Sequence, residues 1–118
     1  MKRYLLIAVL FCCAVAAQAQ ADTDTLRARA QALLIKGDYD NALLVLNHAA
    51  EMDPENKDIL NDQAYIYYLQ RNYAKAIELG KQITSHSNAN AQDYQVLGLA
   101  YKATADYASA EKLYKKGL

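Results

Sequence analysis

Three short elements recur at intervals of 34 residues and restrict the folds that are open to this chain. Each consists of an Asp or Asn, a tyrosine directly after it, and an alanine three positions after the tyrosine. The copies are Asp38–Tyr39 with Ala42, Asn72–Tyr73 with Ala76, and Asp106–Tyr107 with Ala110. A fixed period of this size in 118 residues is typical of an array of helical repeats. The spacing therefore predicts an all-α fold before any local helix propensity is considered.

Residues that cap helix N-termini divide every repeat into two helices. Asp and Asn are preferred there because their side chains accept a hydrogen bond from a free backbone N–H. Six such residues occupy two equivalent positions of the period: Asp22, Asn56, Asn90, Asp38, Asn72 and Asp106. Gly37 can end the first helix in a left-handed conformation, and Pro54 cannot continue the second. We therefore expect helices at residues 23–36, 39–52, 57–70, 73–86, 91–104 and 107–118.

Small residues recur where two helices of a repeat would approach closely, with large residues around them. The third repeat reads Tyr94-x2-Leu97-Gly98-x2-Tyr101, followed by Tyr107, Ala110 and Tyr114. The first repeat carries Leu26, Ala30, Leu33, Gly37, Tyr39, Ala42, Leu46, Ala49 and Pro54. Through these residues the chain resembles the tetratricopeptide repeat family. The resemblance implies a right-handed α-solenoid of antiparallel helix pairs, with repeats at 23–56, 57–90 and 91–118, the last one incomplete.

Departures from this pattern are expected to weaken the array. Arg29 and Gln63 replace the apolar residue that Leu97 supplies in the third repeat, so the first two repeats should be less well buried there. Gly80 stands where the other repeats carry a large residue, and a mid-helix glycine costs up to about 1 kcal/mol relative to alanine. It also leaves space that a neighbouring ring such as that of Tyr94 could fill. We expect the middle repeat to be the least stable.

The first residues have the pattern of a secretory signal peptide. Lys2 and Arg3 give a positive start, residues 4–17 carry no charge and are mostly apolar, and residues 17–19 supply a small-x-small cleavage site. The apolar run is shorter than the roughly 20 residues of a membrane-spanning helix. We expect a signal peptide at residues 1–19, with 21 as an alternative end, and a periplasmic or secreted bacterial protein. An uncleaved membrane anchor is the alternative.

Cysteine and charge patterns exclude several other kinds of site. Cys12 and Cys13 both lie in this leader, and neither follows the small residue that lipid attachment requires. The rest of the chain has no cysteine, hence no disulfide and no thiolate metal site. Of 13 basic residues two lie in the leader, which leaves 11 against 13 acidic ones. Without runs of basic charge we expect no nucleic-acid binding, and membrane contact only through the leader.

In this architecture the first helices of successive repeats line a concave groove, to which residues at helical spacing contribute. Amides and carboxylates beside tyrosines suit an extended peptide, whose backbone needs hydrogen bonds and whose side chains need aromatic contacts. The predicted groove residues are Arg27, Gln31, Asp58, Asn61, Asp62, Tyr65, Tyr68, Gln92, Gln95, Leu99 and Lys102, together with Leu34, Ile35 and Leu69. The alternative for Tyr65 and Tyr68 is simple packing between repeats.

Some members of the family hold the C-terminal carboxylate of a partner through a clamp of Lys, Arg and Asn side chains. The resemblance places Arg27, Gln31, Asp62, Gln92 and Val96 at the clamp positions of this chain. Only Arg27 has suitable chemistry, and Asp62 would repel a carboxylate. We therefore expect no binding of this type.

Catalytic and cofactor signals are weak. His48 and His86 are isolated, each on an expected second helix, with no second histidine at metal-ligand spacing. Residues 53–58 are acidic but lack the alternating ligands and central glycine of a calcium loop. We therefore expect no catalytic residues, no metal and no cofactor.

These observations favour an exported, non-enzymatic adaptor that binds a protein or peptide in its concave groove. One alternative is a structural protein that associates with itself through its C-terminal face, since the chain ends at Gly117–Leu118 before the sixth helix is complete. Another is an accessory module of a longer exported protein. We expect the sequence to be a fragment of a longer array.

Overall fold

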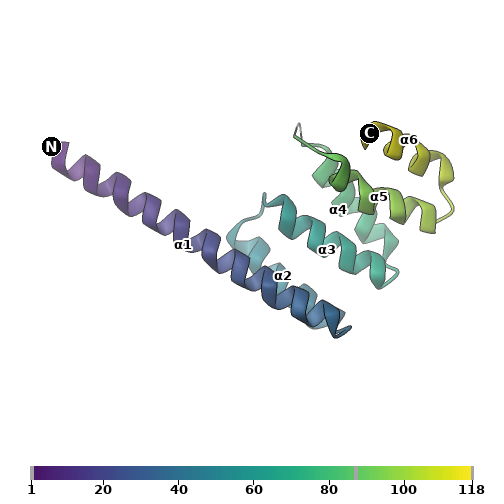
Figure 1. Ribbon diagram of the computed structural model, residues 1–118, viewed down its shortest axis with the longest axis horizontal. Coiled ribbons are helices and arrows are strands. Elements are labelled where there is room, and N and C mark those ends of the chain that lie inside the picture. Colours follow the sequence, from purple (N-terminus) through teal and green to yellow (C-terminus); the bar gives the residue numbers. More distant parts are fainter. Residues whose placement is uncertain (1, 87, 118) are drawn as a thin grey trace.

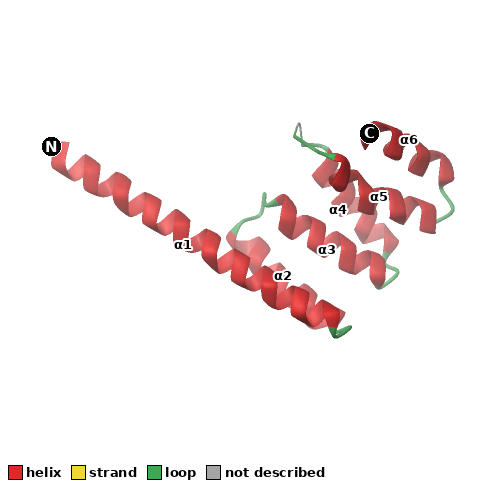
Figure 2. Ribbon diagram, viewed as in Figure 1, coloured by secondary structure: helices red, strands yellow, loops and turns green. Residues whose placement is uncertain are grey.

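The computed structural model describes residues 2–86 and 88–117, and all regular structure in this part of the chain is helical (Figure 2). The helices are α1 (Lys2–Ile35), α2 (Tyr39–Met52), α3 (Lys57–Leu69), α4 (Tyr73–Thr84), α5 (Ala91–Ala103) and α6 (Tyr107–Gly117). They pack as three consecutive pairs, and α1, α3 and α5 also contact one another in series (Figure 1). The arrangement confirms the expected all-α solenoid of about three repeats. Five of the six expected helices agree within two residues at each end.

Side-chain caps explain why these helices start where they do. Asn56 accepts hydrogen bonds from the N–H groups of Asp58 and Ile59, and Asn90 accepts one from Asp93. The remaining caps, each accepting from the residue three positions on, are Asp38, Asn72 and Asp106. The cap prediction is thus confirmed at five of its six positions.

The sixth cap prediction is wrong, because Asp22 lies inside α1. The helix runs without a break from Lys2 through the leader to Ile35. Residues 14–21 are almost entirely Ala and Gln, which are good helix formers and give the backbone no reason to stop. The Asp22 side chain accepts a hydrogen bond from Gln18 one turn earlier instead of capping an N-terminus.

The turns inside the three repeats share one geometry. Two residues after each first helix ends, the chain has a residue with positive φ: Gly37 at 76°, Arg71 at 63° and Ala105 at 63°. In each turn the N–H of this residue and that of the residue after it donate to carbonyls in the last turn of the helix, as from Asp38 N to Leu33 O at 2.9 Å. Glycine adopts this conformation without strain, whereas residues with a Cβ do not. The left-handed backbone conformation therefore repeats every 34 residues, although only the first repeat has a glycine there to indicate it.

Gly80 is tightly packed, contrary to the expectation of free space. A Cβ at this position would lie 2.9 Å from the Cβ of Leu97, so α4 and α5 touch there almost backbone to backbone. Leu97, not Tyr94, fills the space. Tyr94 packs under α6, where the Lys116 ammonium lies 5.8 Å from its ring centroid. In the third repeat the sizes are reversed, because Gly98 accommodates the ring of Tyr114.

The expectation that Gln63 marks a poorly buried position is also wrong. Its side chain is only 7% exposed, and its Nε2 donates to Oδ1 of Asn47 in α2 at 2.9 Å. A buried amide keeps its hydrogen bond in this way and does not need to face solvent. Arg29, at the equivalent position of the first repeat, is exposed as expected.

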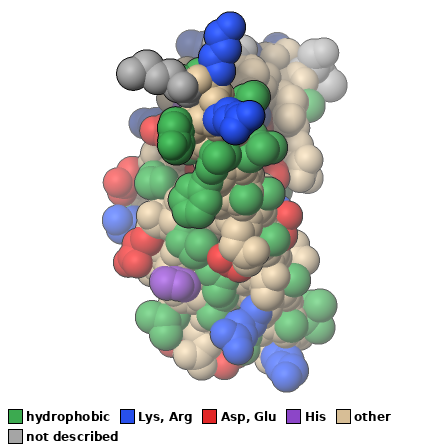
Figure 3. Space-filling view, turned by 90° about the vertical axis from the view of Figure 1, so that its left-hand side faces the viewer, with side chains coloured by type: hydrophobic (Ala, Val, Ile, Leu, Met, Phe, Trp, Pro, Cys, Tyr) green, Lys and Arg blue, Asp and Glu red, His purple; other side chains and the backbone are tan. Residues whose placement is uncertain are grey.

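The N-terminal half of α1 projects from the repeats and is exposed. Seen from this side, hydrophobic side chains form a band on the surface (Figure 3). By length and composition α1 could cross a membrane, and a signal sequence near an N-terminus meets the same criteria. The buried residues of α1 are Thr23 and Ala30, and Ala30 belongs to a hydrophobic cluster with Ala42 and Leu43 of α2. Residues 1, 87 and 118 and the side chain of Tyr107 lie outside what the structure describes.

Candidate functional site

Two adjoining pockets lie along the surface formed by α1, α3 and α5. The first, between α1 and α3, has a volume of about 340 Å³, and the second, between α3 and α5, about 330 Å³. Asp62 and Tyr65 of α3 line both pockets and separate them. We call the two pockets together the groove. The predicted residues that line it are Gln31, Leu34, Ile35, Asn61, Asp62, Tyr65, Gln92, Gln95 and Leu99.

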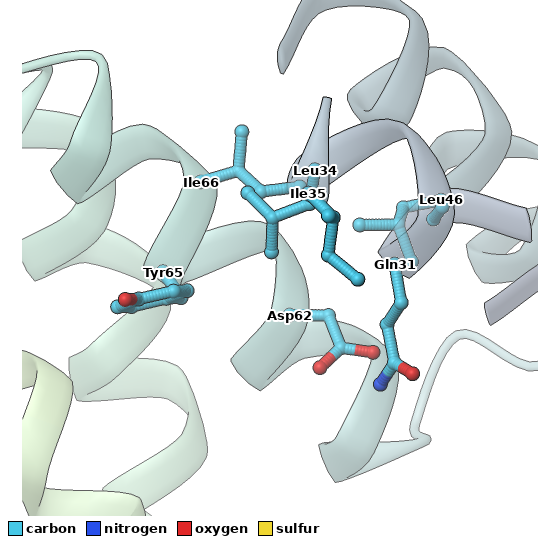
Figure 4. Close-up of a pocket in the computed structure, with 8 residues that line it drawn as sticks. Gln31, Leu34, Ile35, Leu46, Asp62, Tyr65 and Ile66 are labelled. Carbon is cyan, nitrogen blue, oxygen red and sulfur yellow. The ribbon is translucent and has the colours of Figure 1, made fainter. Parts of the chain in front are cut away.

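The first pocket has an apolar side and a polar side. Leu34 and Ile35 of α1 gather with Ile66 of α3, while the carboxylate of Asp62 and the amide of Gln31 lie together at the opposite side (Figure 4). Ile35 is 87% exposed, although it is a large apolar residue. An apolar wall beside a carboxylate can contact both an aliphatic side chain and a hydrogen-bond donor.

The second pocket is more polar. Asn61, Gln92 and Gln95 bring amide groups to it, and Val96 and Leu99 supply the apolar part. Asn61 Nδ2 donates to Oδ1 of Asp93 at 3.0 Å, which fixes the orientation of the amide. Its Oδ1 is buried and has no hydrogen-bond partner within the described residues. Such an acceptor costs about 1–3 kcal/mol while it stays unpaired.

Arg27 is held by aspartates at the edge of the first pocket. Its Nε donates to Asp62 Oδ2 at 2.8 Å, and its Nη1 lies 3.5 Å from Asp58 Oδ2. The hydrogen bond to Asp62, opposed by partial burial and assisted by the charges of Asp62, Asp58 and Asp24, raises the pKa of Arg27. The guanidinium therefore stays charged, but its charge is already matched. This geometry adds to the sequence argument against a carboxylate clamp, because Arg27 is not free for a ligand.

A second ion pair connects α3 to α5 and contacts Asn61, which lines the second pocket. Lys57 Nζ lies 2.7 Å from Oδ2 of Asp93, which is 3% exposed and also accepts from the N–H of Asn90. Burial alone would raise the pKa of Asp93, but hydrogen bonds from Lys57, Asn90 and Asn61 outweigh it and keep the pKa below the usual 3.8. The sequence analysis missed this network. Asn90 followed by an acidic residue three positions later is a capping-box pattern that could have indicated part of it.

Some of the predicted groove residues do not line either pocket. Tyr68 is half-buried between Tyr65, whose ring centroid lies 6.4 Å away, and Tyr73 at 5.9 Å, and it lines neither pocket. Packing between helices is therefore the role that the geometry supports for Tyr68, whereas Tyr65 is 41% exposed at the groove. Lys102 and Leu69 line neither pocket, and Asp58 is 71% exposed beside Arg27. Within residues 2–86 and 88–117, no three His, Cys, Asp or Glu residues are placed to hold a metal ion.

Comparison with known proteins relates this architecture to solved structures. The TPR domain of Sgt2 from Aspergillus fumigatus superposes with a TM-score of 0.77 at 27% sequence identity, over 81% of this chain and 64% of that one. The chain thus spans slightly less than two thirds of the Sgt2 structure. The second TPR of Spaghetti (RPAP3), solved with the HSP90 peptide SRMEEVD, superposes with a TM-score of 0.75 at 16% identity, over 85% and 93% of the two chains.

Family models described as tetratricopeptide repeat match residues 27–92 and residues 92–118. The first match alone covers more than half of the chain. Together with the helix pairs, the repeated turn geometry and the superpositions, these matches show that the chain belongs to the tetratricopeptide repeat family.

Proposed function

We propose that this protein is a non-enzymatic adaptor that binds an extended segment of another protein in the groove between α1, α3 and α5. The observation that carries the proposal is the pair of adjoining pockets, in which exposed apolar side chains stand beside unpaired or solvent-facing polar groups. Isolated exposed apolar residues are common on protein surfaces, but Ile35 and Tyr65 line one concave pocket. An extended peptide offers alternating side chains and backbone amides to such a surface.

The peptide-bound structure of the Spaghetti TPR supports this proposal at the level of the binding mode, since that domain holds a peptide and shares the fold. The chemistry of the bound segment is a separate matter. The HSP90 peptide in that structure has three acidic residues among its last four, Glu-Glu-Val-Asp. In this chain Arg27 is already paired with Asp62.

Selection from a library of linear peptides displayed on phage tests the proposal. We expect enriched peptides to bind the protein, and Tyr65→Ala to weaken them at least about tenfold, since exposed tyrosines at the centre of interfaces commonly contribute more than 1 kcal/mol. Leu44→Ala is the matched control, because Leu44 is 67% exposed on α2 and lines neither pocket. Thermal unfolding should be unchanged in both variants. A library that yields no binder, or binders indifferent to Tyr65→Ala, would show that the groove is not the binding surface.

We further propose that the protein is exported, with residues 1–19 as a cleaved signal peptide. The positive start, the apolar run and the small residues around Ala19 support this. Intact mass spectrometry of the protein recovered from a bacterial periplasm tests it, and the expected chain begins at Gln20 or, for the alternative site, at Asp22. Recovery of the full-length chain with the membrane would indicate the anchor. Full-length protein in the cytosol would contradict both.

Self-association is a second candidate, and one surface favours it. A pocket of about 380 Å³ between α5 and α6 is lined mainly by apolar atoms of Tyr94, Leu113 and Tyr114. Sedimentation velocity over a range of protein concentrations separates the candidates. A monomer at all concentrations supports the adaptor, whereas a concentration-dependent shift to larger species supports self-association.

A further inference from the structure

We infer that the groove selects a segment with an aliphatic side chain and, two residues away, a lysine or arginine, and that it discriminates against acidic segments. This inference rests on the proposed function and names the chemistry of the peptide that the groove accepts. It follows from three features of the pockets: their charge, an unpaired acceptor and their spacing.

The charge of the groove is acidic. Asp62 is the one charged side chain among the described residues that line the two pockets. The nearest cation, Arg27, is shared between Asp62 and Asp58 and also lies in the field of Asp24. One positive charge thus stands against three negative ones. Among the described residues that line the two pockets, a carboxylate finds no cation, whereas an ammonium or guanidinium group finds an excess of negative charge.

An acceptor for such a cation is available where the two pockets adjoin. Arg27 bonds to Oδ2 of Asp62, and no hydrogen bond within the described residues reaches Oδ1. A donor that approaches Asp62 therefore forms a hydrogen bond that the chain itself does not provide. The amide residues Asn61, Gln92 and Gln95 line the second pocket, whereas the first has its apolar wall. The cation of the peptide is therefore placed in the second pocket, next to Asp62.

The first pocket takes the aliphatic side chain. Leu34, Ile35 and Ile66 form its apolar side, away from the Asp62 carboxylate (Figure 4). The two pockets adjoin at Asp62 and Tyr65, so neighbouring side chains on one face of the peptide enter them. In an extended chain these are residues i and i+2, which lie about 7 Å apart. This relation sets the two-residue spacing.

Short synthetic peptides with acetylated and amidated ends test the inference by fluorescence anisotropy. They carry leucine at one position and lysine, glutamine or glutamate two residues later. We expect the lysine peptide to bind roughly fivefold more tightly than the glutamine peptide, as for a partly exposed ion pair, and the glutamate peptide to bind most weakly. Added salt should reduce the difference, because it screens exposed charges.

Three variants sharpen the result. Asp62→Asn should remove the preference for lysine, because it neutralises the one charged side chain among the described residues that line the two pockets. Arg27→Gln should increase the preference for lysine, since the charge of Asp62 is then no longer matched by Arg27. Glu78→Gln is the control, because it removes the same charge from an exposed position on α4 that lines neither pocket.

Equal affinities for the three peptides, or a lysine preference that survives Asp62→Asn, overturn the inference. So does a glutamine peptide with a free N-terminus that binds as well as the lysine peptide, because the cation would then be a chain terminus. If phage-selected peptides bind through Tyr65 in these cases, the proposed groove function still stands. If no peptide of either origin binds, the proposed function itself has failed.

Discussion

At the junction between the first and second repeats, Arg27 of α1 pairs with Asp62 of α3 on the surface of the groove. At the junction between the second and third, Lys57 of α3 pairs with Asp93 of α5. The side chains of the first pair are both about one quarter exposed, whereas Asp93 is almost completely buried and has three donors. Both ion pairs join neighbouring repeats, but they differ in burial. The first leaves Oδ1 of Asp62 without a hydrogen bond within the described residues, whereas both carboxylate oxygens of Asp93 accept hydrogen bonds.

The two junctions also differ in how closely their second and first helices pack, and again the second junction is the more tightly closed. At the first, Gln63 reaches Asn47 through a hydrogen bond between side chains. At the second, the equivalent of Gln63 is Leu97, which lies directly on Gly80. The second junction is the more closely packed one, although Gly80 suggested a weak middle repeat. A glycine in a helix costs stability through the unfolded chain, and here it also permits the close approach of α4 and α5.

The largest effect is expected when the buried pair is broken. Asp93→Ala should lower the free energy of unfolding by about 3 kcal/mol, because it leaves Lys57 without its partner in a mostly buried site. Asp62→Ala should cost less than about 1 kcal/mol, since Arg27 keeps Asp58 and solvent. Urea denaturation followed by circular dichroism measures both. Equal losses would remove the distinction between the two junctions.

A smaller loss is expected from Gly80→Ala. The new Cβ would meet the Cβ of Leu97, which cannot rotate away, so overpacking should outweigh the gain in helix propensity and cost about 1–2 kcal/mol. Gly98→Ala is the matched comparison, because its new Cβ would meet the ring end of the partly exposed Tyr114, which can move. Thermal unfolding should rank Gly80→Ala as the more harmful. Stabilisation by Gly80→Ala would mean that the close contact is not important.

An increase in stability is expected from a substitution in a turn within the second repeat, which belongs to neither junction. Arg71→Gly should raise the free energy of unfolding by about 1 kcal/mol, since it removes the strain of a side chain at positive φ. Gly37→Ala should lower it by a similar amount at the equivalent turn. Chemical denaturation of both variants tests whether the stability of a repeat can be changed without touching its neighbours. Opposite signs are expected, and equal signs would contradict the shared turn geometry.

The smallest expected effect is the response of the second junction to acid. The pKa of Asp93 is lowered in the folded state, so its contribution is complete above the usual value of 3.8 and is lost as the pH falls through the lower folded value. Denaturation curves measured between neutral pH and about pH 2 should show this loss. Asp93→Asn should reduce the acid dependence, while Asp58→Asn should leave most of it in place. Identical pH profiles for all three proteins would exclude Asp93 as a source.

The helices were predictable because their signals are local. A capping side chain bonds to an N–H two or three residues away, so Asp38, Asn56 and Asn72 announce helix starts without knowledge of the fold. The prediction of a cap at Asp22 was wrong because a local signal does not show whether the preceding residues are already helical. Likewise, Arg71 and Ala105 adopt the conformation of Gly37 through their place in the repeat and not through their own preference.

The lining of the groove was predictable only in part. Helical spacing was sufficient to place Asp62, Tyr65 and Gln95 on one surface, but Tyr68, Leu69 and Lys102 line neither pocket. It could not show that Asp62 engages Arg27, or that Leu97 covers Gly80, because these contacts depend on the rotation and separation of neighbouring repeats. Such quantities are set by packing across the junctions, and no single repeat encodes them.

The continuity of α1 has a mechanical consequence. A straight helix is stiff against bending and twisting along its axis, and α1 has no break between Lys2 and Ile35. Its C-terminal turns carry Gln31, Leu34 and Ile35, which form one wall of the first pocket. A partner or membrane that holds the projecting half of α1 would therefore constrain the orientation of this pocket wall relative to α3. In a chain cleaved near Ala19 the projecting half is absent, and only packing against the repeats would orient the wall.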